Sequence, residues 1–213
     1  MHHRTLLTAA ALALAAPIAA AAPLSTFDTG SDGWVTSTQP GLLFEGGTLF
    51  RPSTGGNPGG HLRATDTAPG QGSLPIQAPA AFTGDLSAFA AIRFDQIAFP
   101  SNYTRGLRVD IIGAGGTRYN KLADQPATNL SWETVTLEFS SFVKQGDGTA
   151  SLDEVLADVE VLLVSLEVSG NSDGRLEGGV DNVTLVPAAI PLPAAPVLLV
   201  TGLAGLALLR RRG

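Results

Sequence analysis

The sequence has no cysteine, and it has only three histidines among its 213 residues. Without cysteine the chain cannot form a disulfide framework, use thiol catalysis or bind zinc through thiolates. Two of the histidines, His2 and His3, lie at the start of the chain, so His61 is the one histidine of the central part. This excludes a zinc or copper centre built from several histidines.

Positive charge is also scarce. The chain has 13 Lys and Arg against 19 Asp and Glu, a formal net charge of −6. Arg4 and the three arginines 210–212 lie in the terminal segments, which leaves nine positive charges against 19 negative charges in between. Phosphate binding needs clustered positive charge, so the composition argues against nucleic acid as a partner. An acidic body is compatible with divalent cations.

Long apolar runs are confined to the two ends. At the start, Arg4 precedes an apolar run from Leu6 to Ile18, and small residues that a signal peptidase accepts follow at Ala19 to Ala21. The run is shorter than the roughly 20 residues of a transmembrane helix. We therefore expect residues 1–21 to be a cleaved signal peptide.

The other end carries three features in order. They are the motif Pro191, Leu192, Pro193 and Ala194, an uncharged apolar run to Leu209, and the arginines Arg210, Arg211 and Arg212. A helix from Ala194 to Leu209 would span roughly 24 Å, and one from Ile190 just reaches across roughly 30 Å of hydrocarbon. Positive charge tends to stay in the cytoplasm, so we expect residues 188–213 to hold a transmembrane helix with the body outside.

These three features together resemble the C-terminal sorting signal of the PEP-CTERM proteins, in its VPLPA-type variant. Ile190 stands where that motif has valine. The resemblance implies a Gram-negative host, recognition by an exosortase-type membrane transpeptidase, removal of the tail, and delivery to the cell surface or extracellular matrix. It implies nothing about what the central part of the chain binds.

The central part, residues 22–187, is long enough for one domain and has a β pattern. The chain has 25 Gly and 14 Pro, and apolar residues alternate in short runs. The clearest expected strands are residues 91–99, 106–113, 132–139 and 179–186. Residues 159–168 are almost continuously apolar, which predicts a central strand covered on both faces. A hairpin with Gly46 and Gly47 as its turn is expected within residues 41–50.

One short helix is expected from Leu152 to about Ala157, because Ser151 and Glu154 form a capping box at its start. About nine or ten strands with glycine-rich turns favour two packed sheets over a closed barrel. The expected fold class is therefore all-β, a jelly-roll β-sandwich with one short helix, between the signal peptide and the sorting helix.

Short motifs along this stretch resemble, in the same order, the laminin B (domain IV) module. The motifs are Phe27-Asp28 with Gly33-Trp34, Gly56 to Leu62 followed by Asp66, Gly84 to Ser87, Trp132, Leu156 to Val159, and Asp181-Asn182-Val183. The resemblance implies a jelly-roll sandwich similar to carbohydrate-binding modules, found in matrix proteins and without an established catalytic centre. The Cys-rich repeats that flank this module in laminins are missing here, so laminin partners are not carried over.

Catalysis would need two carboxylates about 5 to 10 Å apart across a cleft. Asp95 and Asp110 lie on expected strands, but in a chain with 19 acids some convergence arises by chance. No Gly-x-Ser-x-Gly elbow supports His61 as a catalytic base. We therefore expect a protein that is not an enzyme, with His61 as a surface residue of a strand.

Asp28, Asp66 and Asp181 are the candidate ligands of a structural Ca²⁺. They lie after the first expected strand, at the end of the strand that begins at His61, and on the last strand. A hard cation bound by carboxylates and carbonyls would tie the first and last strands together. The alternative is that Asp28 and Asp66 cap turns and that Asp181 accepts hydrogen bonds from nearby backbone N–H groups.

Tyr103, Arg105, Arg118 and Tyr119 are the candidate ligand-binding residues. Aromatic rings stack on pyranose faces, and polar neighbours form hydrogen bonds with sugar hydroxyls. The alternative is that the large aromatics, Trp132 among them, belong to the core and that the arginines only solvate an outward face.

Together these features predict an exported bacterial protein of the cell surface or extracellular matrix, transiently anchored in the inner membrane. Its expected role is adhesion or polysaccharide binding, with an exopolysaccharide as partner. Two alternatives remain open: a secreted polysaccharide-active enzyme, which predicts paired acids in a groove, and a structural surface component without a ligand.

Overall fold

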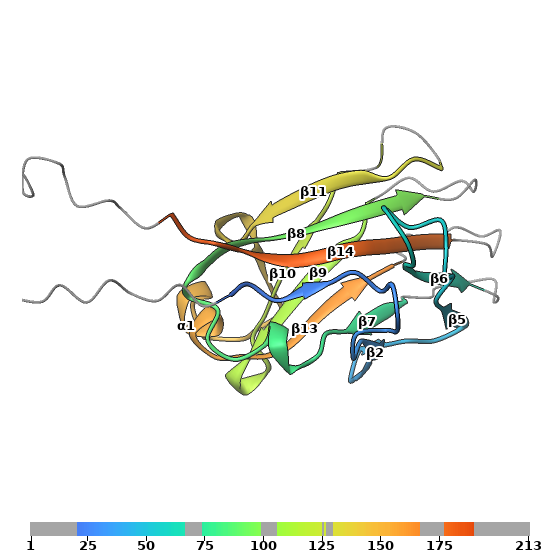
Figure 1. Ribbon diagram of the computed structural model, residues 1–213. Coiled ribbons are helices and arrows are strands. Elements are labelled where there is room, and N and C mark those ends of the chain that lie inside the picture. Colours follow the sequence, from blue (N-terminus) through green and yellow to red (C-terminus); the bar gives the residue numbers. More distant parts are fainter. Residues whose placement is uncertain are drawn as a thin grey trace, which may run out of the picture.

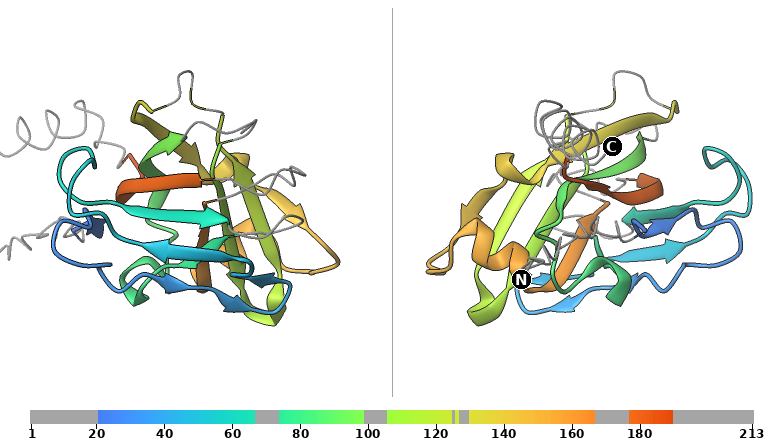
Figure 2. Two further views of the ribbon diagram at one scale, coloured as in Figure 1. Left: turned by 90° about the vertical axis from the view of Figure 1, so that its right-hand side faces the viewer. Right: turned by 60° about the vertical axis from the view of Figure 1, so that its left-hand side comes forward.

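The computed structural model describes residues 21–66, 74–98, 106–124, 126, 130–166 and 177–189. In this part of the chain two antiparallel sheets face each other, and the hydrophobic core lies between them (Figure 1). Figure 2 shows the two layers from two further sides. The fold is thus a β-sandwich, as the alternating sequence pattern predicts.

Sheet A has the strand order β11-β8-β14-β6-β5, and β1 also pairs with β14. Its strands are β1 (Leu24–Ser25), β5 (Gly47–Phe50), β6 (Leu62–Asp66), β8 (Phe89–Ala98), β11 (Glu133–Glu138) and β14 (Glu177–Pro187). Sheet A therefore joins the first and the last described strands of the chain.

Sheet B has the strand order β12-β10-β9-β13-β7-β2. Its strands are β2 (Val35–Thr36), β7 (Pro75–Gln77), β9 (Arg108–Gly113), β10 (Arg118–Leu122), β12 (Val143–Gln145) and β13 (Val159–Ser165). A separate two-stranded hairpin is formed by β3 (Thr38–Gln39) and β4 (Leu42–Leu43).

Alternating side chains of both sheets fill the core. Ile92 and Phe94 on β8 are fully buried, as are Val109 and Ile111 on β9, and Trp34 before β2 is 1% exposed. All five belong to one apolar cluster. Burying a side chain of this size contributes roughly 1.5 to 3 kcal/mol, so these contacts hold the two sheets together.

The helix α1 (Leu152–Ala157) is confirmed together with its capping box. The backbone N–H of Glu154 donates to Ser151 Oγ at 3.3 Å, and the backbone N–H of Ser151 donates to Glu154 Oε2 at 2.7 Å. These bonds satisfy two donors that the start of a helix leaves free. The strands expected around residues 91–99, 106–113, 132–139 and 179–186 are confirmed as β8, β9, β11 and β14.

The central strand β13 is covered on both faces, as predicted. It pairs with β9 on one side and β7 on the other, and Leu162 and Val164 lie in the main core. On its outer face Val161 and Leu163 pack against Leu42 of the β3–β4 hairpin. The hairpin thus covers part of the outer face of sheet B.

The prediction of a hairpin within residues 41–50 is wrong. β4 pairs with the strand before it, β3, and β5 pairs with the strand after it, β6. Gly46 and Gly47 therefore lie where the chain passes from one sheet to another. A Cβ atom at Gly47 would overlap the side chain of Leu74. This glycine is therefore needed for close packing, and a Gly-Gly pair alone does not distinguish that role from a turn.

Residues 1–20 and 190–213 lie outside the described residues, and with them most of the predicted signal peptide and the sorting motif. Within the described part of the chain, no helix is long and apolar enough to cross a membrane. The predictions on export, on Pro191 to Ala194 and on Arg210 to Arg212 therefore stay predictions.

Candidate functional site

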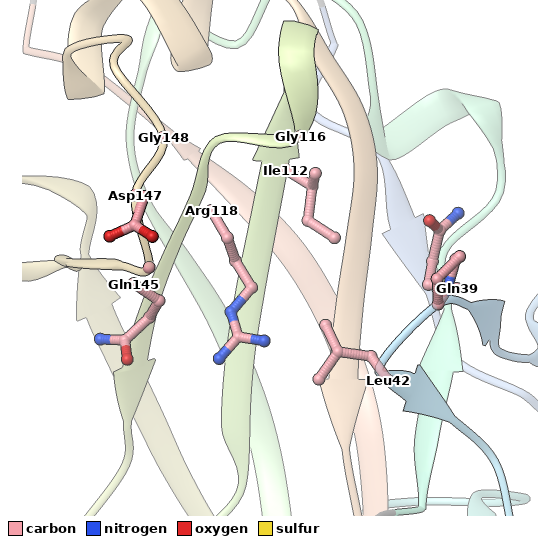
Figure 3. Close-up of a pocket in the computed structure, with 10 residues that line it drawn as sticks. Gln39, Leu42, Ile112, Gly116, Arg118, Gln145, Asp147 and Gly148 are labelled. Atoms are coloured by element: carbon pink, nitrogen blue, oxygen red, sulfur yellow. The ribbon is translucent and has the colours of Figure 1, made fainter.

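A groove of about 570 Å³ lies on the outer face of sheet B, between the β3–β4 hairpin and the turn after β12 (Figure 3). Its size falls in the usual range of ligand pockets. The lining residues are Gln39, Pro40, Leu42, Ile112, Gly116, Arg118, Gln145, Gly146, Asp147 and Gly148. Amide, guanidinium and carboxylate groups thus share the groove with the apolar side chains of Pro40, Leu42 and Ile112.

The first wall is the β3–β4 hairpin, which apolar contacts hold against the sheet. Leu42 is 6% exposed and packs on Val161 and Leu163, with Ile112 at the edge of this cluster. The backbone N–H of Ser37 donates to the carbonyl of Pro75 in β7 at 3.0 Å. Because Leu42 packs on the sheet in this way, Gln39 of the same hairpin lies beside the groove (Figure 3). Pro40 also lines the groove.

The second wall is the end of β12 and the turn that follows it. Gln145 pairs with Arg118 across β12 and β10. Gly146 turns the chain with a φ of 70°, and a Cβ atom at Gly148 would lie 2.5 Å from Thr117 Oγ1. These glycines let the turn approach the start of β10 closely, and the exposed Asp147 then lies at the rim.

The floor of the groove contains Arg118, which forms an ion pair with Asp110 on the same face of the sheet. Val109 and Ile111 point into the core, so Asp110 between them points outward. Arg108 Nε donates to Asp110 Oδ2 at 2.8 Å, and Arg108 Nη2 donates to Ser165 Oγ at 3.2 Å. On the other side, Arg118 Nε lies 3.4 Å from Asp110 Oδ1. Asp110 is fully buried because its neighbours cover it.

A second polar cluster lies on the outer face of sheet A, under the glycine-rich loop 55–60. Asp181 accepts hydrogen bonds from the backbone N–H groups of Asn57 at 2.6 Å and Asn182 at 2.7 Å. Asp95 accepts from the side-chain amide of Asn57 at 3.1 Å, from that of Asn182 at 2.7 Å and from Thr134 Oγ1 at 2.5 Å. This network ties the loop to β8, β11 and β14.

Burial raises the pKa of Asp181 to about 6, and the nearby charges of Asp95 and Asp28 add to this rise. The N–H groups of Asn57 and Asn182 lower the same pKa, but their effect is smaller than that of burial. The Asp181 carboxyl group therefore titrates at about pH 6, above the usual range of an aspartate.

The β-sandwich of the described residues is similar to that of solved carbohydrate-binding modules. The chain is similar to the family 11 carbohydrate-binding module of the cellulosomal cellulase Lic26A-Cel5E of Clostridium thermocellum, with a TM-score of 0.54, 18% identity, and coverage of 80% of this chain and 97% of that chain. It is also similar to the CBM22-2 domain of Paenibacillus barcinonensis Xyn10C, with a TM-score of 0.51, 11% identity, and coverage of 78% and 98%. No family model and no curated protein matches the chain.

Identities this low establish the shared fold alone. The predicted jelly-roll-like β-sandwich with one short helix is thereby confirmed. The resemblance to the laminin B module stays a prediction, since the solved structures reported above are carbohydrate-binding modules.

Of the two predicted ligand-binding residues that the structure describes, Arg118 lines the groove and Tyr119 does not. Tyr119, the next residue on β10, points to the opposite face, is 8% exposed, and donates its hydroxyl proton to the carbonyl of Ala150 at 3.1 Å. Tyr119 is therefore a core residue. Tyr103 and Arg105 lie outside the described residues.

Asp28 and Asp181 of the predicted Ca²⁺ site both bind the loop 55–60, since the backbone N–H of Gly60 donates to Asp28 Oδ1 at 3.2 Å. The Cα of Asp66 instead pairs with Gly47, at the other end of β6 from Leu62. Among the described residues, no group of three or more His, Cys, Asp or Glu could hold a metal ion. The Asp181 oxygens accept hydrogen bonds from N–H groups, which is an unfavourable arrangement for binding a cation. The structural Ca²⁺ stays a prediction.

Asp95 and Asp110 do not converge. Asp95 points away from the core on sheet A and Asp110 points away from it on sheet B, while their neighbours Phe94 and Val109 both lie in the core between the sheets. The enzyme hypothesis that needs these two acids in one groove is therefore wrong for this pair.

The prediction that His61 is a surface residue is wrong, because it is only 3% exposed. The half-buried Trp132 packs edge-on against it with ring centroids 5.2 Å apart, and the Trp132 indole N–H donates to the carbonyl of Gly55 at 2.8 Å. Burial, together with the charge of Arg63, lowers the pKa of His61. The covering loop and Trp132 come from distant segments, so the alternation around His61 does not reveal them.

Proposed function

We propose that this chain is a non-catalytic polysaccharide-binding module and that the groove on sheet B holds the glycan. The observation that carries the proposal is the mixture of groups in the groove. Gln39, Gln145, Asp147 and Arg118 supply planar hydrogen-bond donors and acceptors on both walls and on the floor. Such groups match the donor and acceptor pairs that neighbouring sugar hydroxyls present.

The comparisons support the proposal through the fold. One similar structure, with a TM-score of 0.50 and 19% identity, is the Clostridium thermocellum family 11 module in complex with a β-1,3-1,4-mixed-linked tetrasaccharide. The Paenibacillus barcinonensis CBM22-2 domain is described as a xylan-binding domain. Fold alone does not fix a ligand, so the glycan of this chain is argued from its own groove.

The terminal segments supply the cellular context of the proposal. With a signal peptide and an exosortase-type sorting tail, the module would act at the cell surface or in the extracellular matrix, where it would bind an exopolysaccharide of the envelope or biofilm. Its role there would be adhesion.

A glycan array probed with the folded protein tests the proposal. We expect binding to soluble polysaccharides, and we expect a double variant with Gln39→Ala and Gln145→Ala to lose roughly tenfold or more in affinity, because it removes one side-chain amide from each wall. The matched control is Thr136→Ala, an exposed residue of β11 on sheet A. An array without any binding by the folded protein would refute the proposed function. Equal losses of affinity in the double variant and in the control would refute the assignment of glycan binding to the groove.

A further inference from the structure

Arg118 is the one positively charged residue among the described residues that line the groove. Its Nε atom has no hydrogen-bond partner, since its 3.4 Å contact with Asp110 lacks the required geometry. The carboxylate of Asp110 is held by Arg108 at 2.8 Å instead. Two guanidinium groups thus share one carboxylate, which leaves one positive charge in excess beside the groove for a ligand.

The position of Arg118 is set by the sheet. It pairs with Gln145 on β12 and with Ile112 on β9, so its backbone lies in the middle of the groove floor. Figure 3 shows its guanidinium between Gln145 and Leu42. The terminal nitrogens of a guanidinium carry parallel N–H groups, a fork that fits the two oxygens of a carboxylate.

The other residues of the groove also favour a ligand with negative charge. No aromatic ring occurs among the groove residues that the structure describes, so this surface offers no stacking platform for a neutral pyranose. Asp147, the one acid among the described lining residues, is exposed at the rim, where water and salt screen its charge. Affinity in this groove must come mainly from hydrogen bonds, and the strongest of these are charge-assisted.

We propose that the glycan bound in the groove is an acidic polysaccharide and that the Arg118 guanidinium binds a uronate carboxylate. This inference rests on the proposed function and narrows its ligand class. Arg118 is a ligand-contacting residue in this account, and Asp110 is a positioning residue because it is fully buried and cannot reach the glycan.

The test compares each acidic ligand with its neutral form, and variants of Arg118 then show whether this residue causes the difference. Oligosaccharides of polygalacturonate and of alginate are titrated into the whole folded protein, each beside its carboxyl-reduced, neutral form. We expect at least one acidic form to bind roughly tenfold or more tightly than its neutral form, with affinity falling as salt is raised. Arg118→Ala should abolish this difference, and Arg118→Lys, which keeps the charge but loses the fork, should reduce it.

The control variant is Arg93→Ala, an exposed arginine on sheet A, which should leave all affinities unchanged. Equal binding of acidic and neutral forms, or binding of neutral glycans only, overturns the inference and leaves the proposed function standing. An unchanged acidic preference in Arg118→Ala also overturns it. Binding to neither these ligands nor the glycan array overturns the proposed function itself.

Discussion

Asp110 and Arg118 are diagonal neighbours on β9 and β10, with Oδ1 and Nε 3.4 Å apart. In the strand register Asp110 pairs with Asn120, and Arg118 pairs with Ile112. Diagonal side chains on one sheet face are within reach of each other when they are long. A buried carboxylate thus lies between an arginine that neutralises it, Arg108, and an arginine in the groove, Arg118.

Removing the carboxylate in Asp110→Ala should lower both stability and glycan affinity. Two arginines would lose their shared partner, and we expect the free energy of unfolding to fall by about 2 kcal/mol, since both are partly exposed. Denaturant unfolding checks the stability, and titration with the best glycan checks the affinity. Asp147→Ala is the control for charge alone: it should leave the stability unchanged. Affinity that survives in Asp110→Ala would show that Arg118 needs no positioning.

A single substitution should weaken the packing of the β3–β4 hairpin on sheet B. Leu42→Ala removes the side chain that seats the hairpin on Val161 and Leu163, at a cost of about 2 to 3 kcal/mol. Because the hairpin is a wall of the groove, glycan affinity should fall as well. The neighbouring Leu43 is 41% exposed, so Leu43→Ala is a matched control that should change neither property by much. An intact affinity in Leu42→Ala would contradict the role of this wall.

Stability should depend on pH through Asp181. Its pKa is raised from 3.8 to about 6 in the folded protein, so the folded state binds this proton more tightly than the unfolded state does. The penalty for ionising Asp181 is complete above about pH 6 and disappears below about pH 4. Its removal should add up to about 2 kcal/mol of stability as the pH falls through this window.

The measurement is the difference in unfolding free energy between wild type and Asp181→Asn at several pH values. The difference is needed because His61 acts in the opposite direction: its pKa is lowered from 6.5, so its contribution to stability is lost as the pH falls below 6.5. A wild-type minus variant difference that does not change between pH 7 and pH 4 would show that the Asp181 pKa is not raised.

Calcium is tested by thermal melting with and without a chelator. The carboxylate oxygens of Asp181 already accept N–H donors from Asn57 and Asn182, so we expect the two melting curves to superimpose. A shift of several degrees on chelation, abolished by Asp28→Asn, would instead establish the structural Ca²⁺ that the sequence suggested.

The strands that could be predicted are those whose alternation is long enough to show which face is buried, such as β9 and β11. The capping box predicted α1 because its two hydrogen bonds are local. The groove could not be predicted, since Gln39 and Gln145 lie on segments about a hundred residues apart and the hairpin that carries Gln39 has only two-residue strands. Arg118 was recognisable as a candidate because it is outward-facing on a strand, while the burial of His61 depends on a loop that no local pattern predicts.

The central claim is that the groove on sheet B binds the glycan. The most direct measurement is the change in backbone amide NMR shifts when the tightest oligosaccharide from the array is added to the folded protein. We predict the largest changes at Gln39, Arg118 and Gln145, and at the turn from Gly146 to Gly148. Changes confined to the loop 55–60 and Trp132 on sheet A, with the groove unaffected, would contradict the account.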